Sequence, residues 1–234
     1  MKRLVLFAVV LGALASMTWG VGAMITREAA SRLLDTRNAD GWVAHADNIT
    51  VSGFPIRFET VVTGLTLTDI ETGLALSTPD LRLNQDTLRL DRMSANIPYD
   101  ITLTSPEEQV TITHEGLTAS LDVQPTNSFA LDEMEFAVST ATLVSSAGWN
   151  FALSTADVAV TRNGTTAYDI VTTVRNATPP ALLRNVLDPT GALPDSIATM
   201  DITLQLTFDA PWDREAIQQA RPPPTEIIVK DISA

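Results

Sequence analysis

The chain has 234 residues, and its 28 acidic residues outnumber 15 Lys and Arg, which gives a formal net charge of −13 at pH 7. Such a surface repels nucleic acid and anionic lipid headgroups, so no nucleic-acid partner is expected. The chain contains no cysteine, which excludes disulfides, cysteine-ligated zinc and thiol catalysis.

The amino terminus carries an apolar run from Leu4 to Ile25, directly behind Lys2 and Arg3. A helix of this length spans about 33 Å, which matches a bilayer core of roughly 30 Å. The alternative is a cleavable signal peptide, with Ala13-Leu14-Ala15 as its small-residue cleavage site. Because the hydrophobicity continues well past Ala15, a retained transmembrane anchor is the favoured interpretation.

The sequence divides into three predicted parts. Residues 1–25 form a signal-anchor or transmembrane helix, residues 26–41 a helical stalk, and residues 42–234 a β-rich exported domain. Lys and Arg counts on the two sides of the apolar run do not favour a cytoplasmic amino terminus. Long domains are translocated largely regardless of charge, so we still expect export of the β-rich domain.

From Trp42 onward, apolar residues recur with a period of two, which is typical of half-buried strands. The clearest runs are Leu65/Leu67, Leu117/Ala119/Leu121/Val123, Phe136/Val138, Val158/Val160 and Ile202/Leu204/Leu206/Phe208. The alternate positions are mostly Thr, Ser, Gln and Asp. Asn163-Gly164, between two such runs, is a strong hairpin signal. The pattern predicts a long, curved, mostly antiparallel sheet of roughly ten to twelve strands.

Two short helices are predicted late in the chain. Residues 180–187 begin with a proline in the first turn, and residues 212–220 have Asp209 or Asp213 as the candidate cap. Each helix has an apolar side that can cover part of the sheet. A sheet with one apolar face must curl on itself, take a helix or hold an apolar ligand. A packed core is favoured, with an apolar ligand as the alternative.

No catalytic constellation stands out, and neither a cofactor nor a metal site is expected. His45 and His114 are single histidines without a second metal ligand at the required spacing. Asp132, Glu133 and Glu135 lack the regular oxygen spacing of a calcium loop. The chain is therefore interpreted as non-enzymatic. The remaining enzyme hypothesis is an envelope hydrolase with paired carboxylates, either Glu107 with Glu108 or Asp209 with Asp213.

Two segments carry a family resemblance. The first is Gly41-Trp42-Val43 followed by Val51-Ser52-Gly53-Phe54-Pro55-Ile56-Arg57-Phe58, and the second is Phe208-Asp209-Ala210-Pro211-Trp212-Asp213-Arg214 followed by Ala220-Arg221-Pro222-Pro223-Pro224-Thr225. The chain resembles the uncharacterised proteobacterial family called domain of unknown function 2125. The resemblance implies a single-pass inner-membrane protein with its bulk in the periplasm and no established activity. The candidate structural residues are Trp42, Gly53, Phe54, Pro55, Arg57, Phe58, Pro211, Trp212, Asp213 and Arg214.

The architecture also looks like that of AsmA-like envelope proteins, by analogy of fold alone. That analogy implies a curved sheet whose apolar groove holds lipid. The function hypothesis is a membrane-anchored binding or scaffolding protein, with lipid or an envelope protein as partner. The alternative is a protein-interaction module of an inner-membrane complex. Family members usually continue with more strands after Thr225–Ala234, so the chain is interpreted as a fragment or a shortened product.

Overall fold

The computed structural model describes residues 42–53, 57–125, 129–181, 184–185, 190, 194–213, 216 and 222–233. This part of the chain forms one antiparallel sheet of 13 strands, one more than the upper end of the predicted range. The strands are β1 Trp42–His45, β2 Asn48–Ser52, β3 Arg57–Asp69, β4 Ala75–Asp86, β5 Arg89–Ile97, β6 Ile101–Thr104, β7 Gln109–Thr113, β8 Gly116–Gln124, β9 Ala130–Ser145, β10 Asn150–Arg162, β11 Ala167–Ala177, β12 Ile197–Phe208 and β13 Pro224–Ser233. The predicted mainly β fold and its long antiparallel sheet are confirmed.

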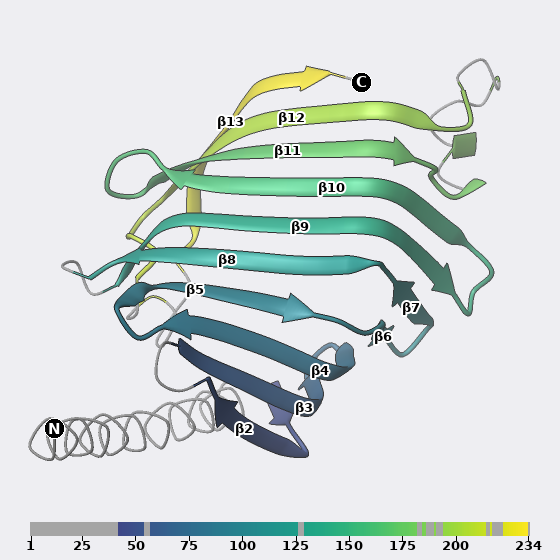
Figure 1. Ribbon diagram of the computed structural model, residues 1–234. Helices are drawn as coiled ribbons and strands as arrows, with labels where there is room; N and C mark the ends of the chain where they lie inside the picture. Colours follow the sequence, from purple (N-terminus) through teal and green to yellow (C-terminus); the bar gives the residue numbers. More distant parts are fainter. Residues whose placement is uncertain are drawn as a thin grey trace, which may run out of the picture.

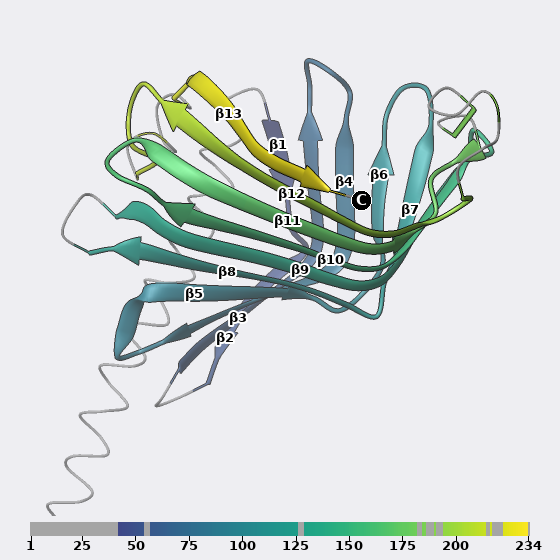
Figure 2. The ribbon, with the colours of Figure 1, turned by 90° about the horizontal axis from the view of Figure 1, so that it is seen from above.

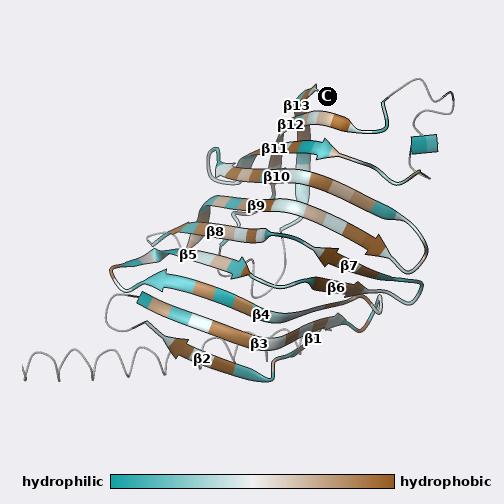
Figure 3. Cartoon of the chain, turned by 45° about the vertical axis from the view of Figure 1, so that its right-hand side comes forward, coloured by the Kyte–Doolittle hydropathy of each residue, from teal (hydrophilic) through white to brown (hydrophobic). Residues whose placement is uncertain are grey.

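The strands follow one another across the sheet in the order β1-β3-β4-β5-β8-β9-β10-β11-β12-β13 (Figure 1). β2 pairs with β3 beside β1, while β6 and β7 bridge β4 and β9. The Asn163-Gly164 hairpin lies between β10 and β11 as predicted, and Gly164 has a φ of 103°. Figure 3 shows apolar and polar residues alternating along β3, β9 and β10.

The sheet is strongly curved, and its long strands bow along their length (Figure 2). Three residues within the long strands are in the left-handed backbone region: Gly64 in β3, Thr140 in β9 and Asn176 in β11, with φ of 65°, 46° and 50°. A left-handed residue reverses the alternation of side chains along a strand. Val174 and Ala177, on the two sides of Asn176, are consequently both buried.

Polar side chains brace the outside of this bend. The Thr140 hydroxyl donates to Glu115 Oε2 at 2.8 Å, and the Asn176 amide donates to Ser154 Oγ at 3.2 Å. These four residues are exposed. Apolar side chains therefore stay on one face of the sheet and polar ones on the other.

The two predicted late helices fall mostly outside the described residues. Arg184 N donates to Pro180 O at 3.0 Å, as in a helical turn, and Asp213 Oδ1 accepts from Ala216 N at 3.0 Å, as a helix cap does. Within the described ranges, no helix is long and apolar enough to cross a bilayer. The predicted anchor and stalk, residues 1–41, lie outside those ranges.

Candidate functional site: the inner face of the sheet

The inner face of the sheet consists of cross-strand rows of apolar side chains. Directly paired residues of antiparallel strands share a face, so the strand register defines each row. The rows run Ile97-Leu117-Val138-Ala156-Val174-Met200, then Ala95-Ala119-Phe136-Val158-Thr172-Ile202-Ile232, then Met93-Leu121-Met134-Val160-Ile170-Leu204-Val229. Thr172 is the only residue with a polar side chain in the three rows. We call this surface the inner face.

Most inner-face side chains are only partly covered. Val160 and Val174 are buried, whereas their neighbours in the same rows are mostly half-buried. The apolar side chains of β13 are exposed: Ile227, Val229 and Ile232 are 63%, 56% and 63% exposed. The described part of the chain thus leaves much of a large apolar surface open, which a monomeric soluble domain rarely does without a use for it.

The segment after β12 closes one end of the inner face. Tyr168 of β11 is only 1% exposed, and its ring meets Phe208 edge-on at 5.9 Å between centroids. Phe208 in turn meets Trp212 edge-on at 5.5 Å. Two hydrogen bonds hold the segment: Trp212 N donates to the Tyr168 hydroxyl at 3.3 Å, and Leu131 N donates to Trp212 O at 2.7 Å.

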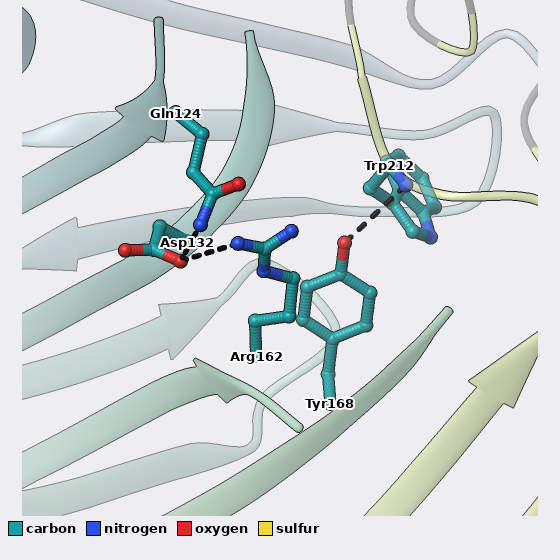
Figure 4. A network of polar contacts seen from close by, with 5 residues as sticks. All are labelled: Gln124, Asp132, Arg162, Tyr168 and Trp212. Atoms are coloured by element: carbon teal, nitrogen blue, oxygen red, sulfur yellow. Dashed lines mark hydrogen bonds and ion pairs between the residues drawn. The ribbon is translucent and has the colours of Figure 1, made fainter. Parts of the chain in front are cut away.

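A polar network stands beside this aromatic cluster (Figure 4). Asp132 Oδ1 accepts from Arg162 at 2.9 Å and from the Gln124 amide at 3.1 Å. The Arg162 side chain is 13% exposed and that of Asp132 is 50% exposed, so the pair bridges the interior and the solvent. Burial raises the pKa of Tyr168 above its ordinary value, more than the nearby Arg162 lowers it. The phenol is therefore a neutral hydrogen-bonding group at this end of the sheet.

The outer face has the opposite character. Its rows include Ser94-Ser120-Glu135-Ala159-Val171-Thr203 and Asn96-Thr118-Ala137-Asp157-Thr173-Asp201. On this face the Lys230 side chain extends from β13 over β12 to β11, where it donates to Asp169 Oδ1 at 2.5 Å. This hydrogen bond is the largest cause of a lowered pKa at Asp169. The sheet thus separates an apolar surface from a polar one that carries Glu135, Asp157 and Asp201.

Comparison with known proteins gives the family. Residues 19–234 match the family described as an uncharacterised protein conserved in bacteria, domain of unknown function 2125. The chain belongs to this family. No curated protein and no solved structure matches the chain. Membership brings no established activity with it, so the function must be argued from the site.

The first family-like segment lies at the edge of the sheet. Trp42 begins β1, and Gly53 follows β2 with a φ of 99°. Arg57 N donates to Gly53 O at 3.1 Å, which makes a turn, and the exposed Arg57 side chain lies 3.5 Å from Glu59. Phe58 is half-buried in β3. Phe54 and Pro55 lie outside the described residues.

The second family-like segment is the one that closes the inner face. Pro211 and Trp212 are half-buried there, and Asp213 caps the following turn. Arg214 lies outside the described residues. Sequence reasoning singled out Trp212 but not Tyr168, whose hydroxyl accepts from the Trp212 amide, nor Arg162 of the adjoining polar network. The contact of Tyr168 with Trp212 joins residues 44 positions apart, and no local pattern indicates such a pairing.

Of the carboxylates considered for catalysis, Glu107, Glu108 and Asp213 make hydrogen bonds within the fold. Glu108 Oε2 accepts from the Trp149 indole at 2.7 Å and from the Ser145 hydroxyl, and Glu107 accepts from Ser105. Glu133 and Glu135 are exposed on the outer face, away from the inner rows. Among the described positions, no three His, Asp or Glu side chains gather as a metal site would require.

Proposed function

We propose that the protein is a non-enzymatic, membrane-anchored binding protein that holds the acyl chains of a lipid on its inner face. The observation that carries the proposal is the set of three apolar rows, which crosses from β5 to β13 and is mostly half-buried, with exposed side chains at β13. Covering apolar surface with an apolar ligand is favourable by roughly 25 cal/mol per Å² removed from water.

The shape of the sheet supports a chain-like ligand. The rows run across the strands at about 4.8 Å per strand, so six strands span about 24 Å of continuous apolar surface. Along the strands, the aromatic cluster of Tyr168, Phe208 and Trp212 limits the surface at the start of β11 and the end of β12, whereas across the strands the β13 edge is open. A flexible hydrocarbon follows such a curved strip better than a rigid ligand does.

The expected location supports the same ligand class. The apolar run at residues 4–25 has the length of a bilayer span, so the sheet is expected to work beside a membrane, where lipid is the abundant apolar molecule. The second candidate function is a protein-interaction module. The incompletely buried inner face supports this second function as well, because an amphipathic segment of a partner protein would cover the same rows.

The first test is organic extraction of the protein, purified from membranes without harsh detergent, followed by mass spectrometry. We expect a reproducible phospholipid or fatty acid at near-stoichiometric amount. A clean blank, together with no uptake of lipid from vesicles, would contradict lipid binding and favour the interaction module.

A matched pair of neighbouring positions identifies the face involved. Thr172 lies in the middle inner row and Val171 lies on the outer face. Thr172→Asp places a charge between Val158 and Ile202, so bound lipid should fall several-fold, whereas Val171→Asp should leave it unchanged. Equal loss in both variants would contradict an inner-face site.

A fluorescent label makes the same comparison without a new charge. Because the chain has no cysteine, Thr172→Cys or Val171→Cys accepts one environment-sensitive dye. Phosphatidylcholine vesicles should shift the emission of the Thr172→Cys label to the blue and leave the Val171→Cys label unchanged.

A further inference from the structure

The outer face carries two adjoining hollows that the proposed lipid site does not use. The larger, of about 440 Å³, is lined by Asn84, Arg92, Ser94, Ala95, Asn96, Thr118, Ala119, Ser120, Glu135 and Ala137. The smaller, of about 250 Å³, shares Glu135 and Ala137 and extends over β10 and β11 to Asp157 and Thr173. Small side chains in the outer rows leave this space. Together the hollows form a groove across the strands, which we call the outer groove.

The polar groups of the groove define the chemistry that fits it. Hydroxyls of Ser94, Thr118 and Ser120 and amides of Asn84 and Asn96 offer donors and acceptors side by side. The Asn96 Nδ2 donates to Leu117 O at 3.2 Å, so the side-chain oxygen of Asn96 can serve as an acceptor for a ligand. No aromatic residue lines the larger hollow.

One cationic side chain, Arg92, and two carboxylates, Glu135 and Asp157, line the groove. Arg92 lies 3.2 Å from Asp122, and Glu135 accepts from the Ser120 hydroxyl at 3.3 Å. The formal charge of −13 for the whole chain disfavours an anion. A neutral ligand whose groups both donate and accept hydrogen bonds meets these conditions, whereas a hydrocarbon does not.

We propose that the outer groove binds a neutral oligosaccharide. Each sugar hydroxyl can both donate and accept a hydrogen bond, so it can pair with the hydroxyls and amides that line the outer groove. The volume of the larger hollow falls within the range of small-ligand sites, roughly 300–1,000 Å³. Without an aromatic stacking platform the binding is weak, with a dissociation constant on the order of 1 mM. This proposal does not depend on lipid binding, because the two sites lie on opposite faces of one sheet.

The test is ligand-observed NMR, by saturation transfer, with maltotriose and chitotriose as probes and the full chain as receptor. We expect saturation transfer to at least one of the two probes. Ala137→Leu fills the space that the two hollows share and should abolish the signal. Thr203→Leu, on the same face but outside both hollows, is the matched control and should keep it.

A second variant covers the case in which Ala137→Leu fails to fold, which circular dichroism would reveal. Glu135→Ala removes an exposed carboxylate that lines both hollows and should weaken binding about three- to tenfold, as expected for one lost hydrogen bond. Absence of transfer to both sugars would overturn the proposal. So would a signal that a folded Ala137→Leu variant retains in full.

Discussion

At the residue scale, Gly53 illustrates how one backbone conformation shapes an edge of the sheet. Its φ is 99°, and a Cβ there would stand 2.8 Å from the backbone oxygen of Arg57. Gly148 has a similar φ of 89°, but a Cβ at that position would meet no other atom within 4 Å. The two positions therefore separate the intrinsic cost of the conformation from the cost of a steric clash.

Gly53→Ala is expected to destabilise the protein more than Gly148→Ala. Both substitutions cost about 1–2 kcal/mol for a left-handed alanine. Only Gly53→Ala must also displace the Arg57 carbonyl and with it the turn bond from Arg57 N to Gly53 O, so its total should exceed about 2 kcal/mol. Urea denaturation of the two variants measures the difference, and equal losses would contradict the steric argument.

The Lys230–Asp169 pair should give stability that depends on pH. The hydrogen bond from Lys230 lowers the pKa of Asp169 in the folded state. The pair therefore stabilises the fold above the ordinary aspartate value of about 4, and the benefit is lost as the pH falls through the lowered folded-state pKa. Because both side chains are about one-third exposed, the pair contributes roughly 0.2–1 kcal/mol.

Lys230→Met tests this pair. We expect a lower free energy of unfolding than the wild type at pH 7 and a smaller difference at a pH below the ordinary aspartate value of about 4. Denaturant titrations at the two pH values make the comparison. A difference of the same size at both would show that Lys230 acts through packing and not through its charge.

At the element scale, the segment after β12 depends on aromatic contacts with β11. Trp212 contacts Phe208, its amide donates to Tyr168, and its carbonyl accepts from Leu131. Trp212→Ala should lower the free energy of unfolding by about 2 kcal/mol, less than a fully buried tryptophan would, because the side chain is half-buried. Tyr168→Phe should cost about 1 kcal/mol by removing one hydrogen-bond acceptor.

Limited proteolysis reports the local consequence of these two substitutions. Cleavage within residues 209–223 should accelerate in Trp212→Ala and, less strongly, in Tyr168→Phe, while the strands stay resistant. Phe208→Leu is a control that keeps apolar volume but removes the edge-on ring contacts. If cleavage began within β11 or β12 instead, the segment would be part of the global fold and not a separately held closure.

The strands that a period of two defines and a curved sheet were predictable, but the residues with left-handed backbone that interrupt the long strands were not. Alternation along β8, β9, β10 and β12 follows from local sequence, and Asn163-Gly164 indicates its own hairpin. Thr140 and Asn176 adopt positive φ without being glycine, which depends on their neighbours across the sheet.

At the scale of the whole molecule, the apolar composition of the inner face was predictable, but the extent to which its side chains are buried was not. The apolar positions of each strand follow from alternation, so a one-sided sheet could be expected. Whether those side chains are packed or left half-exposed depends on the curvature and on the segment after β12, both set by long-range contacts. The sequence pattern favours a packed core, whereas the described part of the chain leaves the inner rows largely half-buried.

The open inner face leads to a prediction about the whole protein. A lipid that binds only the folded state stabilises it by RT ln(1 + [L]/Kd), about 2.7 kcal/mol at a hundredfold excess over Kd. The protein stripped of lipid should therefore unfold at a lower temperature than the protein as purified, and phosphatidylcholine vesicles should restore the difference. Differential scanning calorimetry of the three samples measures the difference in melting temperature.

The two charge variants are the control for this prediction. The melting temperature of Thr172→Asp should respond little to vesicles and that of Val171→Asp should respond normally, because only the first variant places a charge among the apolar rows. Identical melting temperatures with and without lipid would mean that the inner face is stable uncovered, and a protein partner would then become the better explanation of its exposure.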